Sequence, residues 1–98
     1  MITPFMIYED QLDTLKWVLS KYNEEVMSKQ APYSEFKVVN AFEDDQAFIV
    51  EIEVDDGVSF DHIFELGAIW GIIKTQMMCV KCSKEDLVFP SLPLGVTL

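Results

Sequence analysis

Two β-rich segments separated by four polar residues constrain the fold of this chain more than any other feature. Residues 35–42 read EFKVVNAF and residues 47–54 read AFIVEIEV, and both are rich in the β-branched and aromatic residues that favour strands. The connection between them, EDDQ at residues 43–46, is polar, as turns usually are. The sequence therefore predicts an antiparallel β-hairpin.

The side-chain pattern of this hairpin also predicts its register. If Phe42 lies opposite Phe48, one face of the hairpin pairs Asn40 with Val50, Val38 with Ile52 and Phe36 with Val54. The other face then pairs Lys37 with Glu53 and Val39 with Glu51. A shift of one residue would break both patterns, so we expect the first face to point into the core.

Amphipathic helices are expected on both sides of the hairpin. Residues 9–30 carry apolar side chains at spacings of three and four, namely Leu12, Leu15, Leu19, Tyr22 and Val26. Pro32 ends this pattern. Residues 59–76 predict a second helix, with Ser59 as its N-cap and a core stripe made of Ile63, Leu66, Trp70 and Ile73.

The order of the segments predicts the fold class. Residues 1–8 are β-rich, and residues 77–82, MMCVKC, are the expected last strand. The resulting order β-α-β-β-α-β is that of a ferredoxin-like α+β sandwich, in which two helices cover one face of an antiparallel sheet. We expect a single domain over residues 1–98, with residues 86–98 as an extended apolar tail that packs on the domain or on a partner subunit.

Charge and composition limit the classes of partner. Seven Lys and Arg residues against seventeen Asp and Glu residues give a formal charge of −10, which repels nucleic acid and favours a basic protein partner or plain solubility. The chain contains no arginine, so it lacks the usual bidentate clamp for phosphate. Half of the residues are hydrophobic, slightly more than so small a domain needs, and this surplus favours a homo-oligomer, a dimer above all.

No membrane or export signal is recognised in the sequence. The first residues, MITPFMIYED, lack a basic region and a long apolar run, and no segment reaches the roughly 18 apolar residues of a membrane span. We therefore expect a soluble, cytoplasmic protein that does not bind membranes.

Cys79 and Cys82 are the first candidates for a chemical site. In a strand their side chains would alternate, and two sulfur atoms on opposite faces cannot hold one ion. His62 is the only histidine, so a Cys/His zinc site is incomplete in one chain. We expect no metal and no cofactor, and a thiol or metal-binding protein using the cysteine pair is the alternative function.

Catalytic residues are not indicated either. His62 lies beside Asp61 and one helical turn from Glu65, but the sequence identifies no nucleophile near it. Phosphate-binding, hydrolase and zinc-protease motifs are absent from the sequence. The acidic segment from Asp55 does not fit an EF-hand, because its third position is Gly57 and its twelfth is Leu66. We therefore expect a protein that is not an enzyme; a small-molecule-binding regulatory domain is a further alternative.

Surface residues point to protein binding. Trp17 is expected on the polar side of the first helix, where either the tail covers it or it anchors a partner, and Ile72 on the outer side of the second. Negative charge gathers around the hairpin at Glu43, Asp44, Asp45, Glu51, Glu53, Asp55 and Asp56. The sequence thus predicts a small acidic interaction module that self-associates, with inhibition of a basic partner by DNA-like charge as its mechanism.

Overall fold

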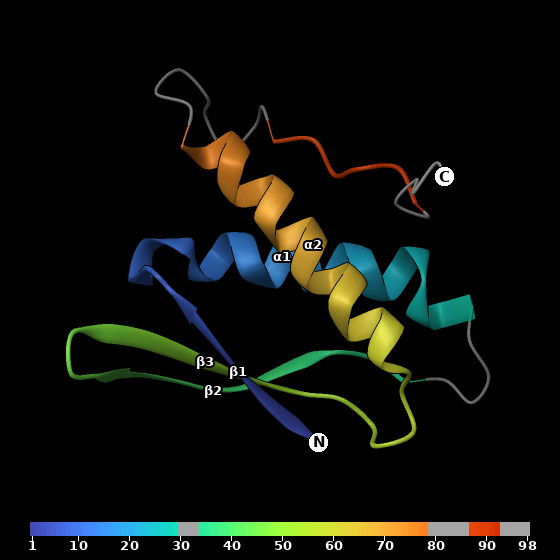
Figure 1. Ribbon diagram of the computed structural model, residues 1–98, viewed down its shortest axis with the longest axis horizontal. Coiled ribbons are helices and arrows are strands. Elements are labelled where there is room, and N and C mark those ends of the chain that lie inside the picture. Colours follow the sequence, from blue (N-terminus) through green and yellow to red (C-terminus); the bar gives the residue numbers. More distant parts are fainter. Residues whose placement is uncertain (30–33, 79–86, 93–98) are drawn as a thin grey trace. The chain divides into compact units, whose positions relative to one another are not determined.

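The part of the chain that the structure describes has an α+β fold with a three-stranded antiparallel sheet and two helices (Figure 1). The computed structural model describes residues 1–29, 34–78 and 87–92. These residues belong to two compact units, Met1–Val58 and Ser59–Leu98, and each unit is described by itself below.

The first unit is built from β1 (Ile2–Ile7), α1 (Leu12–Glu25), β2 (Lys37–Asp44) and β3 (Ala47–Glu53). Short 3-10 turns flank α1 at Glu9–Gln11 and Met27–Lys29. The strands lie in the order β1-β3-β2, so β3 is central and pairs antiparallel with both neighbours. In Figure 1, α1 lies on one side of the three strands.

The register of the hairpin is confirmed at one end and wrong at the other. Lys37 pairs with Glu53 and Val38 with Ile52, as expected. A β-bulge then inserts Val39, so that Asn40 lies opposite Glu51. From there on β2 is displaced by one residue, and Phe42 pairs with Ile49 instead of Phe48. The bulge therefore turns Phe42 to the face that we call the outer face, which is the one that Lys37, Ile49 and Glu53 share.

A tight turn closes the hairpin. Asp44 pairs with Ala47, which leaves only Asp45 and Gln46 between the strands. Both residues have positive φ angles, 49° and 73°, as two-residue turns that match the twist of a hairpin require. Asp tolerates this conformation well, whereas Gln adopts it rarely.

The inner face of the sheet and the facing side of α1 form the core of the first unit. The side chains buried there are apolar: Ile7, Leu15, Val18, Leu19, Tyr22, Phe36, Val50, Ile52 and Val54. Asn23 fastens α1 to the segment before β2, because its amide donates to the Phe36 carbonyl (3.0 Å) and accepts from the Phe36 N–H (2.8 Å). The Tyr22 and Phe36 rings also meet edge to face, with centroids 5.8 Å apart.

The second unit contains α2 (Phe60–Met77). Ser59 caps it as expected, since its hydroxyl accepts a hydrogen bond from the Asp61 N–H at 3.1 Å. The helix runs through Met77 and is capped by Met78, so the expected strand cannot begin at Met77. Cys79 and Cys82 lie outside the described residues. Near the end of α2, the Gln76 side-chain amide donates a hydrogen bond to the Val88 carbonyl (2.8 Å) and accepts one from the Val88 N–H (2.7 Å).

Apolar side chains occur on more than one side of α2. Leu66, Ile69, Trp70 and Ile73 are buried, whereas Phe60, Phe64 and Ile72 are 69%, 74% and 39% exposed. Ile63, which the sequence assigned to the core stripe, is only half-buried, and Ile69 belongs to the buried set in its place. Neither helix in the described ranges combines the length and apolar character that crossing a membrane requires.

Candidate partner-binding surface

The outer face of the sheet carries three rows of side chains, because directly paired residues in neighbouring strands point to the same face. From the hairpin turn toward the other end, these rows are Met6–Ile49–Phe42, Pro4–Glu51–Asn40 and Ile2–Glu53–Lys37. The first row is wholly apolar, and the other two place a carboxylate on the central strand. A further pair on this face, Asp44–Ala47, lies next to the turn, so the apolar row has a carboxylate on either side of it along the strands.

The apolar row is open to solvent. Met6 is 72% exposed and Phe42 is 38% exposed, while Ile49 between them is half-buried. Ile2, in the third row, is 52% exposed, so the apolar character continues along β1. Exposed apolar groups that lie side by side commonly mark a place where another molecule binds.

The two central carboxylates lack cationic partners in the part of the chain that the structure describes. Glu51 accepts one hydrogen bond, from the Asn40 amide at 2.9 Å. Lys37 lies opposite Glu53 in the register, yet its ammonium group pairs with Glu35, at 3.5 Å. The carboxylates of Glu51 and Glu53 are therefore available to a cation from outside the unit.

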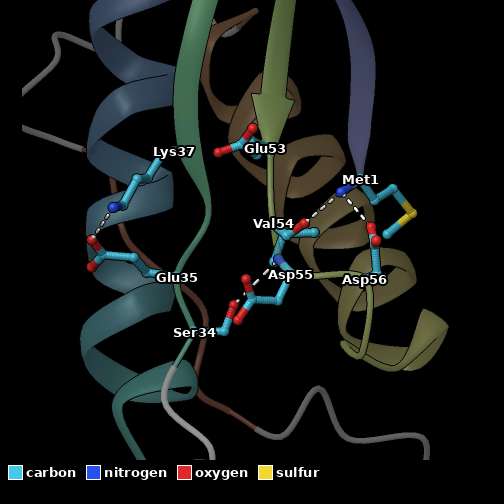
Figure 2. A pocket seen from close by; sticks show the side chains of 8 residues that line it. All are labelled: Met1, Ser34, Glu35, Lys37, Glu53, Val54, Asp55 and Asp56. Carbon is cyan, nitrogen blue, oxygen red and sulfur yellow. Dashed lines mark hydrogen bonds and ion pairs between the residues drawn. The ribbon is translucent and has the colours of Figure 1, made fainter.

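An open cleft of about 390 Å³ lies at the acidic end of the sheet (Figure 2). It is lined by the segment before β2, the first residue of that strand, the end of β3 and the N-terminus: Met1, Ser34, Glu35, Lys37, Glu53, Val54, Asp55 and Asp56. Four of these residues are acidic, against Lys37 and the terminal ammonium group. The cleft thus extends the negative charge of β3 beyond the strand.

Hydrogen bonds hold the shape of this cleft. The Met1 ammonium group donates to the Val54 carbonyl at 2.9 Å and to the Asp56 carboxylate at 2.6 Å. The Asp55 N–H donates to the buried Ser34 hydroxyl at 3.4 Å. The hydrogen bond and the charge of the ammonium group together lower the pKa of the Asp56 carboxyl. Asp56 is therefore held ionised at neutral pH.

A second hollow of about 620 Å³ follows α1 and the start of β2. Its walls are mixed in character, with the buried Leu19 and Phe36 beside charged side chains such as Lys16 and Glu24. The Asn23 amide that fastens Phe36 lies in this hollow, so its residues serve the packing of α1 on the sheet.

The structure separates the predicted partner-binding residues into several places. Glu51, Glu53, Asp55 and Asp56 lie together along β3 and in the cleft. Glu43, Asp44 and Asp45 lie at the hairpin turn, about 20 Å from Glu53 if β3 rises 3.3 Å per residue.

The remaining predicted residues lie on the helices or outside the described part. Trp17 is half-buried on α1, and Ile72 lies in the second unit. His62 is half-buried in the first turn of α2. Among the described residues, no three His, Cys, Asp or Glu side chains come together in a way that could hold a metal ion.

Sequence reasoning missed the apolar row of the outer face. It treated this face as charged and solvated, and it assigned Phe42 to the core side. One signal was present in β1, where Ile2, Pro4 and Met6 alternate with Thr3, Phe5 and Ile7, so that both faces of this strand are largely apolar. The bulge at Val39, which places Phe42 beside Ile49, has no comparable signal in the sequence.

Comparisons with known proteins returned no match, whether to a protein-family model, to a curated protein or to a solved structure.

Proposed function

We propose that this protein is a non-enzymatic interaction module that binds a basic protein partner through the outer face of its sheet. The observation that carries the proposal is the line of carboxylates at Glu51, Glu53 and Asp55, which follows the central strand into the acidic cleft. Exposed carboxylates without cationic partners attract a basic protein from a distance and favour one orientation of it. Inhibition of that partner, by occupying its basic site, is the biological action we propose.

The density of this charge argues for a protein ligand site rather than a close imitation of DNA. Alternate residues of a strand are about 6.7 Å apart, so the line carries roughly one charge per 6.7 Å. Double-stranded DNA carries one charge per about 1.7 Å of its axis. A partner with a few well-placed Lys or Arg side chains matches the sparser line better than a surface built for a nucleic acid.

A charge-reversal experiment with a matched control tests this proposal. Glu51→Lys/Glu53→Lys changes the outer face, and Glu24→Lys/Glu25→Lys makes the same change in net charge on exposed residues of α1. Calorimetry with lysozyme as a basic probe, at low salt, should show affinity falling about tenfold further for the first variant than for the second. Binding should also weaken as salt is raised to about 0.3 M.

Equal losses in the two variants would contradict the proposal, because they would show that only the net charge of the protein matters. Tight binding of the wild type that is indifferent to salt would contradict it too.

The proposal includes a second surface, on α2, that joins two copies of the chain. Phe60, Phe64 and Ile72 are exposed there. In the described part of the structure, a Cβ atom added to Gly67 or Gly71 would meet no atom within 4 Å, so internal packing does not account for these glycines. Each lowers helix stability by about 1 kcal/mol relative to alanine. Close approach of a second copy would explain both the glycines and the exposed aromatic rings.

Light scattering over a concentration series tests the self-association. Ile72→Glu should convert the dimer into a monomer. Truncation after residue 86 tests whether the tail contributes to the dimer. Met6→Glu, which adds the same charge to the outer face, should leave the dimer intact. A wild-type protein that stays monomeric at all concentrations would remove self-association from the proposal.

A ferredoxin-like layout is also part of the proposal. The order β1-β3-β2, antiparallel throughout, corresponds to three neighbouring strands of that fold. In the described ranges β1 pairs on one side only, and a fourth strand, formed by residues that follow Met78, would complete the sheet there. Hydrogen exchange tests this, since the outward N–H groups of β1 should exchange slowly if a strand covers them and fast if none does.

A further inference from the structure

We propose that the partner presents a helix with apolar and basic side chains on the same face. This helix lies along the outer face, with its apolar side chains on the row Met6–Ile49–Phe42 and its Lys or Arg side chains on Glu51 and Glu53. This inference rests on the proposed function and specifies the chemistry of the partner. It is carried by the order of the rows, in which Glu51 and Glu53 follow the apolar row along β3 in the direction away from the hairpin turn.

The first step is that a partner bound by charge alone would contact only part of the outer face. A partner that contacts only Glu51 and Glu53 would leave Met6 and Phe42 exposed at 72% and 38%. Burying apolar surface that is now exposed is favourable, to a degree comparable with a good interfacial ion pair. A ligand that covers the apolar row and the carboxylates together therefore binds much more tightly than a purely basic one.

The second step excludes a second copy of this chain as the occupant. Two outer faces stacked about a twofold axis would bring the central β3 strands together. Glu51 and Glu53 of one copy would then meet those of the other, and among the described residues of this face only Lys37 would be at hand to neutralise them. Burying like charges without partners is strongly unfavourable. A partner that brings its own cations avoids this repulsion.

The third step sets the spacing of the residues on the partner. Ile49, Glu51 and Glu53 follow each other at about 6.7 Å along β3, so the carboxylates lie about 7 and 13 Å from the apolar row. A helix rises 5.4 Å per turn. Basic residues about one turn and two turns from an apolar anchor lie on the same helix face, and the length of Lys and Arg side chains covers the remaining distance.

The helical form follows from which part of the sheet is used. An extended peptide pairs with the edge of a sheet through its backbone, whereas a helix meets the side chains of a face. The residues concerned point out of the face, and the apolar row crosses all three strands. This surface matches a helix that is laid along β3 and whose contacting face carries apolar side chains at one end and basic side chains at the other.

Three synthetic peptides test the inference in titrations followed by NMR of the full chain. The first is a Leu/Lys helix in which the leucines and the lysines lie on the same face, with lysines one and two turns from the leucines. In the second, serine replaces leucine, and in the third, glutamine replaces lysine. The first should bind at least about tenfold more tightly than either of the others, and its largest shifts should fall on β1, β2 and β3.

Matched variants locate the binding. Phe42→Ser should weaken binding of the Leu/Lys helix about tenfold or more, and Met6→Ser should act in the same direction. Phe64→Ser removes an equally apolar side chain that is 74% exposed on α2, and it should change the affinity less than twofold. Circular dichroism of each variant shows whether the fold is retained.

The outcomes separate this inference from the proposed function. If the Leu/Lys and Ser/Lys helices bind equally well and Phe42→Ser changes nothing, the basic partner stands and the apolar contact is wrong. If the Leu/Gln helix binds as well as the Leu/Lys helix, the surface is apolar and the proposed attraction to a basic partner fails. If none of the peptides binds, both are overturned.

Discussion

The inner and outer faces of the same three strands both carry apolar side chains but differ in how far these side chains are buried. On β3, Ile52 on the inner face is 1% exposed, whereas Ile49 on the outer face is only half-buried. On β1, the inner Ile7 is 6% exposed and the outer Met6 is 72% exposed. Apolar side chains thus occupy both faces, and α1 lies on only one side of the strands (Figure 1). Burial in this sheet is decided by what covers a face and cannot be inferred from hydrophobicity alone.

The largest expected effect on stability comes from replacing an isoleucine on the inner face of β3, compared with the same replacement on its outer face. Ile52→Ala should lower the free energy of unfolding by about 2–4 kcal/mol, because it leaves a cavity under α1. Ile49→Ala should lower it by about 1 kcal/mol or less, because solvent already reaches that side chain. Urea unfolding of both variants measures the difference, and equal losses would show that the outer face is covered in solution.

A pair of asparagines sharpens the same contrast in terms of hydrogen bonds. Asn23→Ala removes both bonds to the Phe36 backbone and should destabilise the protein by about 2 kcal/mol. Asn40→Ala also removes two hydrogen bonds, the one that its amide donates to Glu51 and the one that its oxygen accepts from the Ala41 N–H, but both are exposed, so the effect should stay within about 0.5 kcal/mol. If the two variants unfold at the same urea concentration, Asn23 does not hold α1 on the inner face.

The hairpin turn offers a smaller and opposite effect. Gln46 has a φ of 73°, so Gln46→Gly should raise stability by about 1 kcal/mol. Gln46→Ala serves as the control, since alanine retains a Cβ atom and should bring no gain. A thermal melt measures both variants, and equal stabilisation by Ala and Gly would show that the backbone conformation is not the source.

The smallest effect concerns the acidic end of the outer face and depends on pH. Because the pKa of Asp56 is lowered in the folded state, its contribution is present above the ordinary carboxyl pKa and is lost as pH falls through the lowered value. Asp56→Asn should therefore be slightly less stable than the wild type at neutral pH, and the difference should shrink as pH falls below the ordinary carboxyl pKa. Urea midpoints across this range test the sign, and a difference that grows in acid would contradict it.

Much of the fold could be predicted from the sequence because its signals are local and periodic. The spacing of Leu15, Leu19 and Tyr22 identifies α1, and Ser59 marks the start of α2. The end of α2 could not be predicted, since Met77 and Met78 suit a helix and a strand about equally well. The complete ferredoxin-like sheet remains a prediction, because the described residues form three of its strands.

The candidate surface could be predicted only in its charged half. Glu51 and Glu53 are alternate residues of one strand, and Asp55 and Asp56 follow shortly after them. Their proximity in space therefore follows from their proximity in the sequence. The row Met6–Ile49–Phe42 depends on contacts between three strands and on the bulge at Val39. Such a bulge reflects how the whole sheet twists, and alternation within a single strand does not reveal it.

The Val39 bulge also gives the length of β2 a meaning that its composition lacks. Because Val39 has no partner on β3, its loss would join Val38 directly to Asn40 and leave the pairs on both sides of the bulge unchanged. We therefore expect β2 to tolerate a single-codon deletion at the bulge. Every residue of β3 from Ala47 to Glu53 is paired, so a deletion there would turn the residues on one side of it to the opposite face, and selection should resist that length change more strongly.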